Sequence, residues 1–167
     1  MIFITEIETP LGKVVAGSNE GGICLLEFAD RNNKVPEADI VVAENVHLKK
    51  LRKELDEYFK GKRKDFTVPL TPAGTSFRKE VWLTLGKIPF GSTISYSDVA
   101  MRLGNPLSVR AVANANSKNP VAIIIPCHRV IGENGNLTGY AGGLWRKKWL
   151  IEHENKFSGK PVDLKLF

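Results

Sequence analysis

Three short stretches at the start of the chain have the composition of strands, and in the first of them hydrophobic and polar residues loosely alternate. The stretches are residues 1–8, 13–18 and 23–28. Alternation with a period of two is typical of strands that bury one face, and turn-forming residues separate the stretches, so the pattern predicts a meander of three strands. Residues 29–39 are polar and contain Pro36, which predicts a loop.

From Val46 onward the apolar residues recur three and four positions apart. They are Leu48, Leu51, Leu55, Tyr58 and Phe59. This spacing predicts an amphipathic helix. Residues 66–70 are a candidate for one further strand, and residues 71–75 are rich in turn formers. We therefore expect one domain over residues 1–72 and a second over residues 73–167.

Two helices are predicted near the ends of the second domain. The first is expected to be capped by Ser76, and its apolar face comprises Phe77, Val81, Trp82 and Leu85. The last is expected over residues 144–154, with Trp145 and Trp149 in the core. Three cations are expected on its solvent face, namely Arg146, Lys147 and Lys148.

The centre of the second domain has the pattern of two short helices joined by a tight turn. Ser95 and Asp98 have the spacing of a capping box for a helix over residues 97–103. Gly104-Asn105-Pro106 predicts the turn, and Ser108 is expected to cap the second helix. Two helices joined by a glycine-containing turn form the helix-turn-helix arrangement.

The second of these helices, residues 109–116, is rich in alanine, and Arg110 is its one long cationic side chain. A thin helix can approach DNA closely. In the plainer interpretation the alanines pack against the preceding helix. Neighbouring positions on a helix do not share a face, so some of the alanines must face outward.

Five consecutive apolar residues lead into the chemically most active part of the chain. Residues 121–125 read Val-Ala-Ile-Ile-Ile, which predicts a fully buried strand, and Pro126 is expected to end it. Cys127, His128 and Arg129 follow at once. A nucleophile, a titratable base and a fixed cation therefore stand in three consecutive positions.

A thiol is a good nucleophile only as its thiolate, and a histidine oriented by a carboxylate is a usual activator. Consecutive side chains of an extended segment point apart, so we expect His128 to act on Cys127 through a water or across a turn, with Glu154 orienting its ring. The alternative is a structural thiol beside a histidine in the core. Adjacent Cys and His lack the spacing of metal ligands, so a metal site is disfavoured.

Composition narrows the class of protein. The chain of 167 residues has no apolar run long enough to span a membrane, and its start lacks the basic region of a signal peptide. Two cysteines are too few for a disulfide framework, and a free thiol suits a reducing cytoplasm, where we expect the protein. Cys24 is expected to be a small buried hydrophobe, and a Cys24–Cys127 disulfide is the alternative.

The net charge of +6 is concentrated in the second half of the chain. Residues 1–70 hold 11 lysines and arginines against 12 acidic residues, whereas residues 71–167 hold 13 against 6. A basic half that also carries Cys127 points to a polyanionic partner, with DNA or RNA first among the candidates. Ordinary solubilising charge is the alternative interpretation.

Pro126-Cys127-His128-Arg129-Val130 resembles the active-site signature of the O6-alkylguanine-DNA alkyltransferases. Other segments recur in the order and spacing of that family. They are Phe77, Val81-Trp82, Ile88-Pro89, Gly91, Ser95-Tyr96, Arg110-Ala111-Val112, Asn119-Pro120, Gly139-Tyr140-Ala141-Gly142-Gly143 and Trp149-Leu150-Ile151-Glu152-His153-Glu154. The similarity is dense over residues 75–155 and covers the first 70 residues in outline.

The resemblance implies an α+β protein with a ribonuclease-H-like α/β domain followed by a winged helix-turn-helix alkyltransferase domain. It also implies a catalytic role for five residues. Cys127 would accept the alkyl group, and His128 would draw off the thiol proton through a water while Glu154 holds its tautomer. Asn119 would brace the turn that carries the cysteine. Tyr96 would rotate the target phosphate and donate a hydrogen bond to the departing base.

The resemblance further implies a set of contacts to DNA. Arg110 would fill the gap left in the stack by the everted guanine. The backbone of Cys127 and Val130 would accept from the guanine amino group, and the amide of Ala141 would bond O6. Some relatives have Ser where this chain has Ala141, but a backbone contact tolerates Ala. The other expected contact residues are Ser95, Ala111, Ala115 and Tyr140.

The implied reaction is DNA repair in a single turnover, because the thioether formed on Cys127 is not readily reversed. The implied partner is double-stranded DNA bearing O6-alkylguanine, approached from the minor groove by a monomer, with O4-alkylthymine as a second candidate lesion. No cofactor is expected. No structural zinc is expected either, because Cys24 and His47 do not complete a set of four ligands. A DNA-binding module without chemistry and a cysteine hydrolase are the alternatives.

Overall fold

The computed structural model describes residues 1–31, 35, 38–159, 165 and 166. The chain divides into two compact units, Met1–Ala73 and Gly74–Phe167. Within the part of the chain that the structure describes, no helix is long and apolar enough to cross a membrane.

The first unit is built on a four-stranded sheet. Its strands are β1 (Ile2–Thr9), β2 (Gly12–Ser18), β3 (Ile23–Phe28) and β4 (Ile40–Val42), in the order β3-β2-β1-β4. β1, β2 and β3 form an antiparallel meander, which confirms the three predicted strands, and β4 pairs parallel with β1. The sequence did not predict β4, because three residues are too few to show alternation and their partner lies far away in sequence. Residues 32–34, 36 and 37 of the predicted loop before β4 lie outside the described residues.

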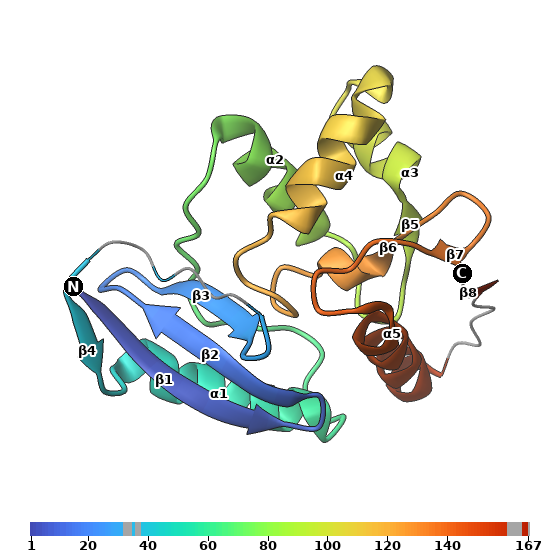
Figure 1. The fold of residues 1–167 in the computed structure, drawn as a ribbon. Helices are drawn as coiled ribbons and strands as arrows, with labels where there is room; N and C mark the ends of the chain where they lie inside the picture. The colour runs from blue at the N-terminus through green and yellow to red at the C-terminus, as the bar shows by residue number, and fades with distance from the viewer. Residues whose placement is uncertain (32–34, 36–37, 160–164, 167) are drawn as a thin grey trace. The chain divides into compact units, whose positions relative to one another are not determined.

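The predicted amphipathic helix is confirmed as α1 (Val46–Phe59), which lies along one face of the sheet (Figure 1). Asn45 caps it, since its side-chain oxygen accepts from the Leu48 amide at 3.0 Å. Leu48, Leu51 and Tyr58 are fully buried between helix and sheet. The side chains at three- and four-residue spacing therefore close the core of this unit.

The further strand considered over residues 66–70 does not form, and Leu70 alone makes a bridge, to Ile23. The buried carboxylate of Glu54 on α1 accepts from the Thr67 amide at 3.0 Å and from the Thr67 hydroxyl at 2.6 Å. It also accepts from the Val68 amide at 3.4 Å. A side chain thus satisfies donors that a strand would have paired with a neighbour.

The second unit is mainly helical. Its elements are α2 (Ser76–Leu85), β5 (Ile94–Ser95), α3 (Tyr96–Arg102), the 3₁₀ turn η1 (Pro106–Ser108), α4 (Val109–Ser117), the 3₁₀ turn η2 (Cys127–Arg129), β6 (Val130–Ile131), β7 (Asn136–Leu137), α5 (Leu144–Ser158) and β8 (Lys165–Leu166). β5 pairs parallel with β6, and β7 pairs parallel with β8. α3, the turn and α4 form the predicted helix-turn-helix (Figure 1).

Only some of the predicted helix caps are present in the structure. The predicted capping box of Ser95 and Asp98 is confirmed at α3. The cap of α2 is Thr75 rather than Ser76, since the Thr75 hydroxyl accepts from the Arg78 amide. Ser108 precedes α4 but donates its hydroxyl to the Asn105 carbonyl at 2.7 Å instead of capping the helix.

The predicted orientation of α5 is wrong for Trp145, Arg146 and Lys147. Trp145 is 58% exposed, whereas Arg146 and Lys147 are buried. Arg146 donates to the Gly142 carbonyl at 3.1 Å and Lys147 donates to the Thr138 carbonyl at 2.9 Å. The loop before α5 thus offers carbonyl oxygens to this face of the helix, and buried cations with such partners are tolerated. Helix periodicity alone does not reveal these partners.

We predict that Glu54→Ala lowers the free energy of unfolding by about 2 kcal/mol, because it leaves the partly buried donors of Thr67 and the buried amide of Val68 without this acceptor. Chemical denaturation of the two proteins measures the difference. Asp56→Ala is the matched control on the same helix, because Asp56 is exposed and its ion pair is a surface pair with Lys60, and its effect should stay within about 0.5 kcal/mol. Equal losses for both variants would contradict the prediction.

Candidate active site

Residues 121–125 form a tight turn rather than the predicted buried strand. The Ile124 amide donates to the Ala122 carbonyl at 2.8 Å, and the Ile125 amide donates to the Val121 carbonyl at 3.1 Å. Ile123 has φ of 73°, a left-handed conformation that is costly for a β-branched residue. Its side chain is 1% exposed, so burial holds it in this conformation.

The buried side chain of Asn119 explains why the strand does not form. Its oxygen accepts from the Val121 amide at 2.9 Å, and its amide nitrogen donates to the Ile125 carbonyl at 2.8 Å. The same nitrogen lies 3.1 Å from Cys127 Sγ. A local side chain therefore competes successfully for the backbone groups of the turn and also provides a donor to the sulfur. This geometry agrees with the bracing role expected of Asn119.

Cys127 begins η2, and all three residues of that turn are buried. Successive side chains of a 3₁₀ turn point in different directions, so His128 turns away from the sulfur and towards α5. His128 Nε2 lies 2.6 Å from Glu154 Oε2. Arg129 donates to both oxygens of the same carboxylate, at 2.8 and 3.1 Å, and to the Ile88 carbonyl at 2.6 Å.

The charges of this cluster fix the tautomer of His128. Burial raises the pKa of Glu154, but His128 and Arg129 outweigh it and hold that pKa well below its usual range. Burial lowers the pKa of His128, and the charges of Arg129 and Lys147 lower it further; together they outweigh the raising effect of Glu154, so the ring is neutral near pH 7. A carboxylate only accepts, so the hydrogen lies on Nε2. Nδ1 keeps its lone pair and has no protein partner among the described residues.

Lys147 is a residue of the site that the sequence placed on the solvent face. It is fully buried, and its ammonium lies 5.8 Å from the centre of the Tyr96 ring. Burial lowers the pKa of Lys147 to about 8, and the charge of Cys127 opposes that shift. A cation that interacts electrostatically with the charged sulfur stabilises the thiolate form of Cys127. No motif marks Lys147, but its contacts follow from the loop that folds over the start of α5.

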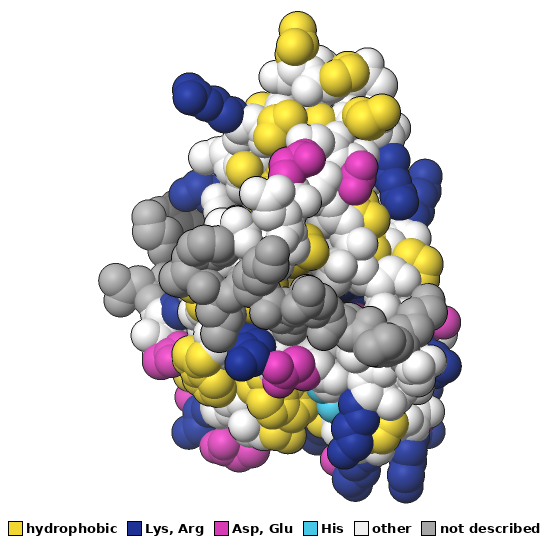
Figure 2. All heavy atoms as spheres, turned by 90° about the vertical axis from the view of Figure 1, so that its right-hand side faces the viewer, with side chains coloured by type: hydrophobic (Ala, Val, Ile, Leu, Met, Phe, Trp, Pro, Cys, Tyr) yellow, Lys and Arg dark blue, Asp and Glu magenta, His cyan; other side chains and the backbone are white. Residues whose placement is uncertain are grey.

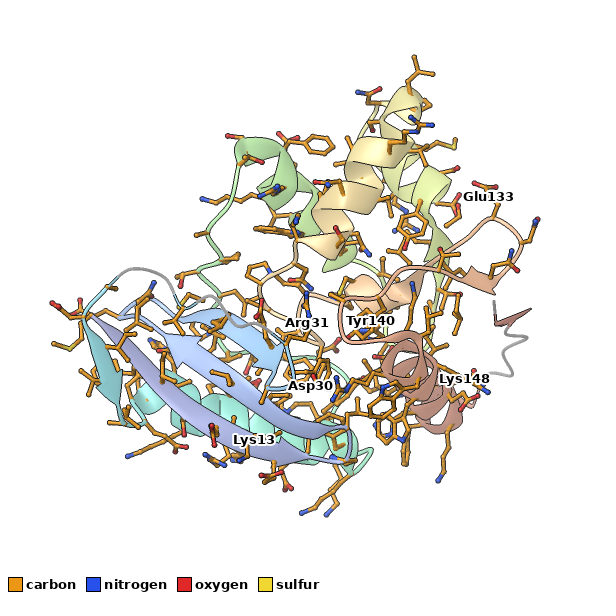
Figure 3. All side chains as sticks on the ribbon, viewed as in Figure 1. Lys13, Asp30, Arg31, Glu133, Tyr140 and Lys148 are labelled. Carbon is orange, nitrogen blue, oxygen red and sulfur yellow. The ribbon has the colours of Figure 1, made fainter. Side chains whose placement is uncertain are left out.

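The other predicted residues of the reaction centre lie in the same unit. Tyr96 donates to the Thr138 carbonyl at 3.3 Å, and burial raises its pKa. Val130 is buried directly after η2, while Tyr140 and Ala141 lie in the loop before α5 (Figure 3). Ser95 is engaged in the cap of α3.

Some alanines of α4 face outward, as approach to DNA would need, and others pack against neighbouring helices. Arg110 and Ala111 are exposed, as a DNA-facing surface requires. Ala115 is 1% exposed, and its carbonyl accepts from the indole of Trp82 at 2.9 Å. The expectation that Ala115 contacts DNA is therefore not met by its side chain, which packs between helices. Asn116 was not predicted to be a site residue. Its side-chain amide donates to the Cys127 carbonyl at 3.4 Å and so joins α4 to η2.

Both cysteines are free, which excludes the Cys24–Cys127 disulfide. Cys24 is half-buried rather than fully buried, and burial raises its pKa. Among the residues that the structure describes, no group of three His, Cys, Asp or Glu side chains is placed to hold a metal ion.

Comparison with known proteins identifies the family. Residues 2–72 match the family model for the ribonuclease-like domain of 6-O-methylguanine DNA methyltransferase, and residues 76–156 match the model for its DNA-binding domain. The chain belongs to the 6-O-methylguanine DNA methyltransferase family. The expected fold class is thereby confirmed, with a ribonuclease-like unit followed by a DNA-binding unit.

Relatives of this methyltransferase match it along nearly its whole length. The methylated-DNA–protein-cysteine methyltransferase of Methanosarcina acetivorans is 43% identical over 153 residues, which are 92% of this chain and 98% of the relative. The constitutive enzyme of Bacillus subtilis is 42% identical over 96% of this chain and 99% of its own. The structure of Mycobacterium tuberculosis OGT in complex with DNA has a TM-score of 0.84 at 35% identity, covering 96% of both chains.

We predict that Glu154→Gln lowers the free energy of unfolding of this methyltransferase by about 3 kcal/mol at pH 7, because Arg129 stays buried without a charged partner. The pKa of Glu154 is lower in the folded state, so its contribution is complete above about pH 4.3 and is lost as the pH falls below that. The deficit of the variant should therefore shrink in acid.

Denaturation at a series of pH values measures this deficit. Glu152→Gln is the control two residues away, since the side chain of Glu152 is 57% exposed and forms a surface ion pair with Lys148. A deficit of Glu154→Gln that stays constant down to pH 3 would contradict the electrostatic assignment.

We also predict that Lys147→Met slows alkylation of Cys127 by iodoacetamide about tenfold at pH 7 and moves the half-maximal rate to higher pH. Methionine fills the same space without the charge. Mass spectrometry of the peptide that contains Cys127 follows the rate. Lys148→Met is the control, because Lys148 lies on the outside of α5 and pairs with Glu152 at 3.7 Å (Figure 3). Unchanged kinetics in Lys147→Met would remove Lys147 from the site.

Proposed function

We propose that this protein repairs DNA by moving the alkyl group of an O6-alkylguanine to Sγ of its own Cys127. One observation carries the proposal. A free cysteine with an amide donor 3.1 Å from its sulfur is followed at once by a buried histidine–carboxylate–arginine cluster. This site lies in a DNA-binding unit of a methyltransferase family.

The reaction is a displacement at the alkyl carbon. The thiol proton passes through a water to Nδ1 of His128, whose other nitrogen is held by Glu154. The sulfur then forms a bond to the alkyl carbon as the carbon–O6 bond breaks. The departing guanine accepts a hydrogen bond from the hydroxyl of Tyr96, and the proton held by His128 returns through water to the guanine, so both side chains end in their starting protonation states. Asn119 and Lys147 stabilise the sulfur before attack.

The product is a thioether, which neither water nor another thiol cleaves readily. Each chain therefore reacts once, and the amount of DNA repaired equals the amount of protein consumed. No cofactor takes part, since the thiol is both nucleophile and acceptor.

The helix that approaches the DNA is α4. Arg110 and Ala111 are exposed on this helix, and the half of the chain that contains it holds 13 basic against 6 acidic residues. Small side chains let the helix enter the minor groove, and Arg110 fills the space of the everted nucleotide. Asn116 links the same helix to the carbonyl of Cys127.

We predict that incubation with a duplex containing one O6-methylguanine adds one methyl group per chain, at Cys127. Intact mass spectrometry followed by peptide mapping measures this. Cys24→Ser should accept the full amount and serves as the matched thiol control, whereas Cys127→Ser should accept none.

Other results would assign another function. Lesion binding without methyl transfer in the wild-type protein would indicate a binding module without chemistry. Methyl loss from DNA with the Cys127→Ser variant, or repeated turnover of an ester, would remove Cys127 as a stoichiometric acceptor.

A further inference from the structure

Leu107, at the turn between α3 and α4, is 96% exposed, more than any other large hydrophobic side chain of the described residues. Met101, at the end of α3, is 64% exposed. Figure 2 shows hydrophobic side chains gathered at this end of the molecule, at the top of the view. A leucine this exposed contributes almost nothing to the core, so folding does not explain its presence.

Leu107 lies at the N-terminal end of the helix assigned to DNA. It belongs to η1, and Ser108, with φ of −88° and ψ of 17°, separates it from the helical backbone that begins at Val109. Leu107 therefore stands three residues before Arg110, at the turn that leads into α4. Both side chains are exposed, as are Ala111 and Asn114 on α4.

The backbone around Leu107 is fixed rather than loose. The Ser108 hydroxyl and amide both donate to the Asn105 carbonyl, at 2.7 and 3.1 Å. Pro106 restricts the preceding residue, and Gly104 supplies the positive φ of 76° that reverses the chain. A leucine carried on such a turn can be pushed into a partner with little loss of conformational freedom.

We infer that Leu107 is an apolar wedge that enters the minor groove ahead of Arg110 and loosens the base step beside the everted nucleotide. The inference rests on the proposed function. Proteins that bend DNA from the minor groove commonly insert leucine or a similar side chain between base steps. The surrounding charge suits DNA, because this half of the chain is strongly basic, and Asp98 on α3 turns its carboxylate to the Ser95 amide.

The test compares Leu107→Ser with Leu83→Ser, whose leucine is 70% exposed on α2 of the same unit. Both are made in a Cys127→Ser background so that binding is measured without transfer. Leu107→Ser should bind a duplex with O6-methylguanine about tenfold more weakly, and Leu83→Ser should bind as the parent does. The slope of log Kd against log salt should stay unchanged, because a leucine neutralises no phosphate.

Unstacking is followed with 2-aminopurine placed next to the lesion. Its fluorescence should rise on binding of the parent and of Leu83→Ser, and much less with Leu107→Ser under saturating protein. Equal affinity and equal fluorescence for the parent and Leu107→Ser would overturn the wedge. In variants that keep Cys127, an unchanged rate of alkylation by iodoacetamide shows that the site remains intact.

Two outcomes separate this inference from the proposed function. If the wild-type protein takes no methyl group from the lesion, the proposed function fails whatever Leu107 does. If it takes the methyl group and Leu107→Ser binds and unstacks normally, only the wedge fails. A parent protein that self-associates in sedimentation, and a Leu107→Ser variant that does not, would assign the leucine to a second copy of the chain instead.

Discussion

The buried carboxylate of Glu154 is the interaction on which the second unit depends. It accepts hydrogen bonds from His128 and Arg129 of η2, and Arg129 also donates to the Ile88 carbonyl. The helix α5, the turn η2 and the segment around Ile88 are therefore joined through this one cluster. Burying a carboxylate is costly unless cations and donors surround it, and here they do so completely enough to keep it ionised. The same carboxylate sets the tautomer of His128, so one ionised group both holds the fold and prepares the base.

The two buried cations Arg129 and Lys147 are positioned in different ways. Arg129 is positioned by the chain next to Cys127, whereas Lys147 reaches the site from α5 because the preceding loop offers it the Thr138 carbonyl. A buried lysine with a lowered pKa costs free energy of folding. That cost is consistent with a functional use, because an apolar residue would fill the same space more favourably.

Local patterns predicted the elements whose hydrogen bonds are local. The strands β1 to β3, the helix α1 and the capping box at Ser95 follow from alternation, helical spacing and short-range chemistry.

The segment 121–125 shows why the remainder could not be predicted this way. Its composition favours a strand, but the side chain of Asn119 takes the backbone groups a strand would have used. The burial of Lys147 could not be predicted for a similar reason, because its hydrogen-bond partner, the Thr138 carbonyl, belongs to another segment. The motif around Cys127 could nevertheless be recognised as a candidate site from the sequence, since adjacent residues need no fold to be brought together.

The left-handed conformation of Ile123 has a consequence for the energetics of attack. The torsional cost of this residue, of order 1–2 kcal/mol, is offset by burial of its side chain beneath the turn. The polypeptide thus becomes ordered around the sulfur during folding, before any nucleic acid arrives. The entropy of organising the nucleophile then does not enter the activation barrier, and what remains to be organised is the substrate's own nucleotide.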